Sequence, residues 1–264
     1  NELKLRIRMN NFDLEGRVAV ITGGNGGIGL GIAEGLALAG PSTMIGGRNL
    51  DKNTLALDRL RTSGGKHEAF VVDVTDKSSI RELIDTTQEM LGPIDILVNN
   101  AGIYIGAEPE VMCDDDWNQV LQTNLQSIVW CSQAAFDDLS SASNRGHQGK
   151  IINIGSMYSL FGADHSIAYA ASKGGVVQLT KSQASAWAKH GINVNSILPG
   201  WIETDMTASI PENPEFYNSI LDRTPFKRFG KIEEMAGSAV FLASSASDFV
   251  TGVALPVDGG YGSS

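Results

Sequence analysis

The sequence has few cysteines, few basic residues and no long apolar run, and each shortage excludes a class of protein. Two cysteines in 264 residues, Cys113 and Cys131, cannot form a disulfide framework, and no further ligands lie near them to complete a zinc site. We therefore expect reduced thiols, a cytoplasmic location and no metal site. Basic residues number 20 against 30 acidic residues, a net charge of −10, which disfavours nucleic acid and anionic membrane surfaces as partners. No apolar run approaches the roughly 20 residues that a membrane-spanning helix needs, so we expect no membrane partner.

The first eight residues carry no apolar stretch followed by small residues, so they do not resemble a signal peptide. We expect residues 1–8 to be an N-terminal extension or a cloning remnant that precedes Met9. The alternating leucines and isoleucine of this octet leave a short edge strand as the alternative. No linker rich in glycine, serine or proline divides the rest of the chain, so residues 9–264 are predicted to form a single domain.

Glycine is in excess: the chain has 30, whereas average usage of about 7% gives about 18. Short runs of β-branched residues alternate with longer helical patterns, which is typical of βαβ units around a parallel sheet. The predicted strands are Val18–Thr22, Thr43–Gly47, Glu68–Val72, Ile94–Val98, Lys150–Ile154, Asn193–Leu198 and Val253–Pro256. The predicted helices are Ile28–Ala39, Asp51–Arg61, Lys77–Leu91, Asp114–Leu139, Ala168–His190 and Ile232–Ser244. Because the strands are almost wholly apolar, we expect an α/β fold in which helices cover both faces of a doubly wound, seven-stranded parallel sheet.

Many of the glycines gather in one turn, Thr22–Gly29, between the first predicted strand and its helix. A phosphate bound at a helix N-terminus needs bare backbone N–H groups that it can approach closely. A tight turn without a ligand is the alternative, but the position after the first strand of a βαβ unit favours a dinucleotide-binding Rossmann fold.

Tyr169 and Lys173 are spaced so that both side chains share one face of a predicted helix, about one turn apart. A neighbouring ammonium favours the tyrosinate, which lowers the phenol pKa toward the range of a general acid/base. Ser156 ends the fifth predicted strand, at the sheet edge where ligands of such folds bind. Asn124 is a polar residue inside a predicted helix. A polar side chain in a helix interior needs a structural or functional reason.

The turn has the pattern Thr-Gly-x-x-x-Gly-Ile-Gly, the fourth strand is followed by Asn99–Gly102, the sixth by Pro199-Gly200 with Thr204, and the chain closes on Asp258–Gly260. Together with Tyr-x-x-x-Lys, these motifs resemble the short-chain dehydrogenase/reductase family from about residue 14 to residue 260. The resemblance implies an NAD(P)-dependent oxidoreductase that interconverts a secondary alcohol and a ketone by hydride transfer.

The resemblance also implies that Asn124, Ser156, Tyr169 and Lys173 form the catalytic group, with a separate role for each. Tyr169 acts as general acid/base on the substrate oxygen, Lys173 shifts the Tyr169 pKa and binds the nicotinamide ribose, and Ser156 hydrogen-bonds the same oxygen. Asn124 holds a water that relays protons. The cofactor-binding residues expected are Gly23, Asn25, Gly27, Ile28, Gly29, Arg48, Asp73, Val74, Asn100, Ala101, Gly102, Tyr169, Lys173, Pro199, Gly200, Ile202 and Thr204.

The end of the second strand bears on the choice of dinucleotide. An acid that binds the adenosine ribose commonly stands there, but Gly47 takes its place and Arg48 follows. A guanidinium suits a 2′-phosphate, so we favour NADP. Asn25-Gly26 stands where many NADP-using relatives have a basic residue, so NAD stays possible. Asp73 matches the residue that contacts adenine in relatives, with a loop-capping aspartate as the alternative.

The expected substrate walls are Ser156, Met157, Tyr158, His165, Tyr169, Trp201 and Met206, with a lid at about residues 203–228. This setting suits a sugar acid, a polyol or a small ketone. A 3-oxoacyl-carrier-protein reductase is an alternative, for which the only basic cluster of the lid is Arg223, Lys227 and Arg228. A non-catalytic dinucleotide sensor is a second alternative, and a serine hydrolase is disfavoured because Ser156 lacks a Gly-x-Ser-x-Gly turn. Family resemblance also implies a homotetramer.

Overall fold

A computed structural model describes residues 10–263, and the extension expected at residues 1–8 lies outside them. One seven-stranded parallel sheet has the order β3-β2-β1-β4-β5-β6-β7, which confirms the predicted doubly wound Rossmann fold. The strands are β1 (Val18–Thr22), β2 (Ser42–Gly47), β3 (His67–Val71), β4 (Ile96–Asn99), β5 (Gly149–Ile154), β6 (Ile192–Pro199) and β7 (Ala254–Val257). The strand order reverses between β1 and β4, and ligands of open α/β sheets bind at that switch point.

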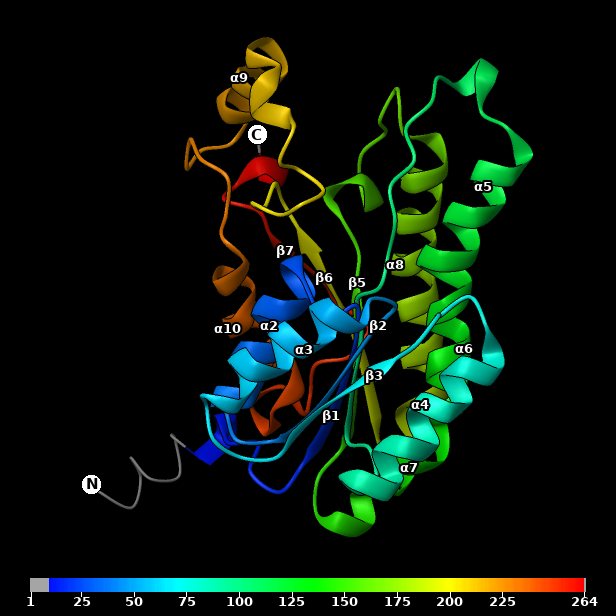
Figure 1. Ribbon diagram of the computed structural model, residues 1–264, viewed down its shortest axis with the longest axis vertical. Helices are drawn as coiled ribbons and strands as arrows, with labels where there is room; N and C mark the ends of the chain where they lie inside the picture. Colours follow the sequence, from blue (N-terminus) through cyan, green and yellow to red (C-terminus); the bar gives the residue numbers. More distant parts are fainter. Residues whose placement is uncertain (1–9, 264) are drawn as a thin grey trace.

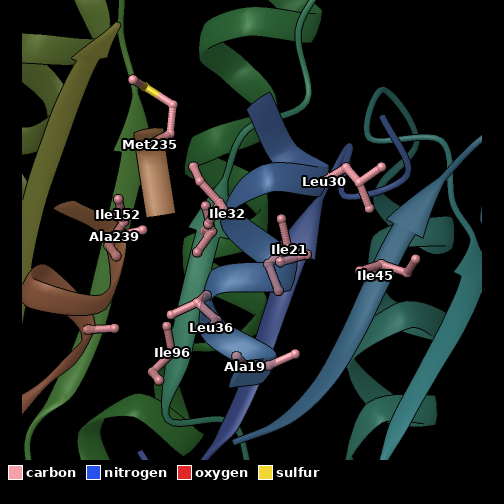
Figure 2. Close-up of a cluster of buried hydrophobic side chains, with 14 of the residues drawn as sticks. Ala19, Ile21, Leu30, Ile32, Leu36, Ile45, Ile96, Ile152, Met235 and Ala239 are labelled. Atoms are coloured by element: carbon pink, nitrogen blue, oxygen red, sulfur yellow. The ribbon is translucent and has the colours of Figure 1, made fainter. Parts of the chain in front are cut away.

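Helices cover both faces of the sheet (Figure 1). One layer holds α2 (Gly27–Leu38), α3 (Leu50–Arg61) and α10 (Ala236–Ala243), and the other holds α4 (Lys77–Met90), α5 (Asp114–Leu121), α6 (Ser127–Ala134), α7 (Phe136–Ser141) and α8 (Ile167–Trp187). Successive strand residues face opposite layers. Ile21 accordingly packs with Leu36 of α2, while Val20 packs with the α4 side. Figure 2 shows the α2 side chains Ile32 and Leu36 among apolar residues of the sheet and of the segment that leads into α10.

The expected lid holds a short 3-10 turn (Ile210–Glu212) and α9 (Pro214–Arg223). Figure 1 shows α9 apart from both helix layers, above the ends of β6 and β7. The helix begins at Pro214 because Asn213 caps it: the side chain accepts a hydrogen bond from the Phe216 N–H. It rests on aromatic contacts, with Phe216 against Trp201 at 5.8 Å and Tyr217 against Phe229 at 5.2 Å between ring centroids.

The single helix expected at 114–139 is wrong in detail, because the structure divides it. After α5 the chain forms a π-helical segment, η3 (Gln122–Gln126), before α6 and α7. Asn124 lies in the middle of η3 and is fully buried. Likewise, a 3-10 turn (Ile232–Met235) replaces the first turn of the helix expected at 232–244, and α10 begins only at Ala236.

None of the helices in residues 10–263 is long and apolar enough to cross a membrane. In the same residues no group of three or more histidine, cysteine, aspartate or glutamate side chains is placed to hold a metal ion. Both thiols are free, as expected, and burial raises the pKa of Cys131 to about 12. Cys131 is therefore an apolar core residue and not a nucleophile.

Candidate active site

The carboxyl ends of the strands open into one cleft of about 590 Å³. The predicted residues that line it are Gly23, Asn25, Gly27, Ile28, Gly29, Arg48, Asp73, Val74, Asn100, Ala101, Gly102, Ser156, Met157, Tyr158, His165, Tyr169, Lys173, Pro199, Gly200, Trp201, Ile202, Thr204 and Met206. Asn124 is the one predicted site residue outside this lining, because it lies buried behind the wall. The structure thus brings residues from across the chain to a single cleft.

The glycine turn is held against the end of β4. Asn100 donates from its amide nitrogen to the carbonyl oxygens of Thr22 and Gly23, both at 3.0 Å. A Cβ at Gly29 would lie 2.2 Å from the Gly23 oxygen, so this close approach requires glycine. The first residue of α2, Gly27, faces the cleft, and its helix N-terminus therefore offers backbone N–H groups to an anion.

At the end of β2, the space that a side chain at Gly47 would need is filled by Asn25. A Cβ at Gly47 would meet the Asn25 amide nitrogen at 2.2 Å. That nitrogen donates to Asn53 Oδ1 at 2.6 Å, and Asn53 in turn donates to the carbonyls of Gly47 and Phe70. The buried Asn53 therefore fixes Asn25 over Gly47 and leaves no room for an acid.

Two cations stand beside this asparagine pair. Arg48 is exposed, lines the cleft and has no acidic partner within residues 10–263. Lys52, one turn into α3, was not predicted from the sequence, and its ammonium contacts Asp205 Oδ2 at 2.8 Å across the cleft mouth. Both positive charges lie at the β2 end of the cleft, where a dinucleotide would place its adenosine ribose.

Asp73 makes the loop-capping contacts that were the alternative, and its contact with adenine stays a prediction. Its Oδ1 accepts hydrogen bonds from the N–H and hydroxyl of Thr75, at 2.9 and 2.7 Å, which is the loop-capping role. The residue also lines the cleft. Its Oδ2 makes no hydrogen bond within the described residues and stays available to a ligand.

The candidate catalytic residues meet near the end of β5. Ser156 caps the 3-10 turn Met157–Ser159 by accepting from the Tyr158 N–H at 3.1 Å. Tyr169 and Lys173 lie one turn apart on α8, and the Lys173 ammonium is 5.7 Å from the Tyr169 ring centroid. That ammonium donates to the Ile154 carbonyl at 2.7 Å, which fixes it at the base of the cleft.

The pKa values of the pair move opposite to the simple expectation. Burial raises the pKa of Tyr169 to about 12, and a hydrogen bond with Ser156 only partly opposes the effect. Burial also lowers the pKa of Lys173 to about 8. In the free chain, loss of hydration outweighs the attraction of the ammonium for a tyrosinate. At neutral pH most Lys173 side chains are still protonated, so the positive charge is present beside Tyr169.

Asn124 acts on the loop that follows β4. Its Oδ1 accepts from the Ile103 N–H at 2.8 Å, and its amide nitrogen donates to the Ile103 carbonyl at 2.9 Å and to Ser172 Oγ at 3.2 Å. Both N–H groups of the amide are therefore used. Of its ordinary hydrogen-bonding positions, only a second lone pair on Oδ1 remains for a water.

Aromatic side chains surround Tyr169. Tyr158 meets it edge-on at 6.3 Å between centroids, and Tyr104, which was not predicted, does so at 5.5 Å. The Tyr104 hydroxyl lies 2.9 Å from Ser166 Oγ, next to the start of α8. Its position two residues after the Asn99–Gly102 motif is the signal that could have found it, since the carboxyl end of a strand faces the site.

A family model described as Enoyl-(Acyl carrier protein) reductase matches residues 23–262. The gluconate 5-dehydrogenase of Gluconobacter oxydans (strain 621H) is 39% identical over 249 residues, covering 94% of this chain and 96% of the relative. The galactitol 2-dehydrogenase (L-tagatose-forming) of Cereibacter sphaeroides is 37% identical over 254 residues, covering 95% and 96%. The crystal structure of a gluconate 5-dehydrogenase from Burkholderia cenocepacia J2315 in complex with NADP and tartrate has a TM-score of 0.91 and 40% identity, covering 97% of this chain and 99% of that one. The chain therefore belongs to the short-chain dehydrogenase/reductase family, and it is an oxidoreductase that acts on CH–OH groups.

Proposed function

We propose that this protein is an NADP-dependent oxidoreductase that interconverts a secondary alcohol and a ketone of a small polyhydroxylated molecule, a sugar acid or a polyol. The observation that carries the proposal is the placement of Ser156, Tyr169 and Lys173 in the same cleft as the N-terminus of α2. The relatives named for gluconate and galactitol support the substrate class.

Within this proposal each residue has a defined task. Tyr169 gives or takes the proton of the substrate oxygen, and Ser156 donates a hydrogen bond to that oxygen. Lys173 holds the ribose next to the nicotinamide, while Asn124 fixes the Ile103 backbone and holds the relay water. The bound oxidised nicotinamide would supply hydride chemistry and a positive charge. A positive charge near Tyr169 favours its tyrosinate and offsets the effect of burial.

The preference for NADP is supported by the β2 end of the cleft. Asn25 fills the space over Gly47 that a carboxylate selective for NAD would need. Arg48, which has no acidic partner among residues 10–263, offers its guanidinium to a 2′-phosphate, and Lys52 offers a second cation if it leaves Asp205. The NADP-bound gluconate 5-dehydrogenase structure agrees with this preference.

Replacing the proposed acid/base tests the function directly. Tyr169→Phe keeps the ring packing but removes the proton donor, so we expect turnover to fall at least about 1,000-fold while NADPH binding, followed by its fluorescence, is retained. Tyr217→Phe removes a hydroxyl from a residue of α9 that packs on Phe229 and does not line the cleft, so it serves as the matched control. Retained turnover by the Tyr169 variant would contradict the proposal.

A carrier-protein substrate is less well supported. The basic residues of the lid that would hold an acidic carrier are already engaged. Arg228 forms a bidentate pair with Glu234, Lys227 pairs with Asp222, and Arg223 lies over the Tyr261 ring at 4.2 Å. A non-catalytic sensor is disfavoured because the Tyr-x-x-x-Lys pair is complete.

We further propose that residues 203–228 act as a substrate lid, that residues 9–264 form one domain, and that the protein is a cytoplasmic homotetramer. The lid is supported by its position over the cleft, which Met206 and Phe216 line. The tetramer is supported by family resemblance and by small residues along α8 that would permit close helix approach. Light scattering on the purified protein tests the assembly, and a monomeric mass would contradict it.

A further inference from the structure

We propose that the substrate half of the cleft selects uncharged alcohols and ketones, such as polyols, over sugar acids. The inference rests on the proposed function and narrows its substrate class. It follows from the charges and ring faces of one side of the cleft, which we call the outer wall and define as residues 104–108 and 164–166. Tyr104, Asp164, His165 and Ser166 of this wall line the cleft, and Glu108 contacts His165 from outside the lining.

Two chain segments pair through their backbones to form the outer wall. The Ala107 N–H donates to the His165 carbonyl at 3.1 Å, and the bridge between Ala107 and Ser166 continues this pairing. The side-chain contact between Tyr104 and Ser166 joins the same segments. The backbone that carries Glu108, Asp164 and His165 is therefore fixed at this side of the cleft.

These charges repel a carboxylate. The two ring nitrogens of His165 face Glu108 at 2.7 Å and Asp164 at 3.7 Å. Two carboxylates thus flank one imidazole, and the group keeps a negative net charge even when the imidazole is protonated. Asp164 is also among the groups that raise the pKa of Tyr158, after burial and its tyrosine neighbours Tyr261 and Tyr104.

The other cations that line the cleft are committed elsewhere. Arg48 and Lys52 stand at the cofactor end, and Lys173 donates to a backbone carbonyl at the base. The lid cation Arg223 lies over the rings of Phe161 and Tyr261, at 4.5 and 4.2 Å from their centroids. Within the described residues, no cation besides His165 lines the substrate half to pair with a substrate carboxylate.

The remaining lining favours an uncharged substrate. Tyr158, Trp201 and Phe216 form a continuous series of edge-on ring contacts at 6.1 and 5.8 Å. Such rings pack well against the C–H faces of a polyol or ketone, whereas a carboxylate beside them loses hydration without gaining a partner. Like charges brought together without compensation reduce binding further.

Matched substrate pairs test the inference. The pairs are galactitol with galactonate, glucitol with gluconate, and methyl acetoacetate with acetoacetate. The first two pairs exchange a terminal hydroxymethyl group for a carboxylate, and the third exchanges a methyl ester for a carboxylate. We expect kcat/KM with NADP(H) to be at least about tenfold higher for the neutral member of each pair that is turned over. Calorimetric titration of the Tyr169→Phe enzyme in complex with NADP should give the same order of affinity. Equal values, or a preference for the acid, would overturn the inference and leave the oxidoreductase function intact.

Two variants test the cause. In Glu108→Gln with Asp164→Asn, the ratio of kcat/KM for the acid to that for its neutral partner should rise at least about threefold, because the imidazole can then pair with the substrate. Asp58→Asn removes an exposed acid on α3 outside the cleft and should leave the ratio unchanged. An unchanged ratio in the double variant would overturn the inference. Absence of any Tyr169-dependent turnover would instead overturn the proposed function, and the inference with it.

Discussion

At the scale of single residues, Gly47 and Asn25 compete for one volume at the end of β2. Gly47→Asp alone must displace the Asn25 amide, which Asn53 holds at 2.6 Å. We expect this variant to lose about 1–3 kcal/mol of stability and at least about tenfold in kcat/KM for NADP. Adding Asn25→Gly makes room for the carboxylate, so the double variant should regain stability and prefer NAD. Kinetics with both dinucleotides and urea unfolding are measured for the wild type, the two single variants and the double variant. If the effects of the two substitutions simply add, the two side chains do not compete for one volume.

Lys173 is a residue whose buried charge costs stability. Since burial lowers its pKa to about 8, the folded chain binds fewer protons than the unfolded chain between about pH 8 and the unfolded pKa. Wild-type stability therefore rises through that window. We expect Lys173→Met to be inactive. At pH 7 without cofactor it should be more stable than the wild type by roughly 1–2 kcal/mol, because removing the buried charge stabilises the folded chain while losing the hydrogen bond to the Ile154 carbonyl offsets part of that gain.

Thermal unfolding at pH 7 and pH 10 checks this prediction. The advantage of the methionine variant should shrink as the pH rises, because the wild-type lysine is then neutral in the folded chain. A Lys181→Met variant on the same helix, where the lysine is exposed, should show no such pH dependence. If Lys173→Met is less stable than the wild type at both pH values, the buried charge of Lys173 does not destabilise the folded chain.

The site was predictable wherever residue type and position after a strand carried the signal. Gly29 and Arg48 belong to this class, and both line the cleft. Lys52 was missed because its place depends on a tertiary contact with Asp205 that no local pattern encodes. Tyr104, in contrast, follows the Asn99–Gly102 motif at the carboxyl end of a strand, and that position could have predicted it. The pKa direction of Tyr169 also required the structure, because burial decides it and spacing to Lys173 does not.

At the scale of elements, the π-helical segment η3 places Asn124 where it supports the cleft wall. Asn124→Ala removes three hydrogen bonds and leaves the Ile103 backbone unpaired, so we expect a loss of about 2–4 kcal/mol in stability. The kcat should fall more than about tenfold because the loop after β4 loosens. Gln126→Ala, exposed on the same segment, is the control. Urea unfolding and steady-state kinetics measure the two effects. Equal effects of Asn124→Ala and Gln126→Ala would contradict the role of Asn124 in fixing the loop after β4.

The strands were predicted well because apolar runs such as β1 are buried on both faces. The helix expected at 114–139 failed for a physical reason: inserting one residue into a helical turn barely alters the local apolar periodicity, so the pattern cannot reveal η3. What places η3 is the pairing of Asn124 with Ile103, a contact between distant parts of the chain.

At the scale of the whole molecule, the proposed cofactor would bind groups from both halves of the sheet, from Arg48 near β2 to Lys173 on α8. A ligand that binds only the folded chain adds about 2.7 kcal/mol of stability at 100 times its Kd. For a chain of this size, each kcal/mol shifts the unfolding midpoint by about 2–4 °C, so NADPH at that concentration should raise it by about 5–10 °C.

NADH at the same concentration should raise the midpoint by much less, because it lacks the phosphate that Arg48 and Lys52 would hold. Arg48→Ala should therefore reduce the NADPH shift and leave the NADH shift almost unchanged, while Arg61→Ala, which removes an exposed arginine at the far end of α3, should alter neither. Thermal scans of the three proteins with each dinucleotide measure these shifts. A larger shift with NADH than with NADPH in the wild-type protein would contradict both the cofactor preference and the role given to Arg48.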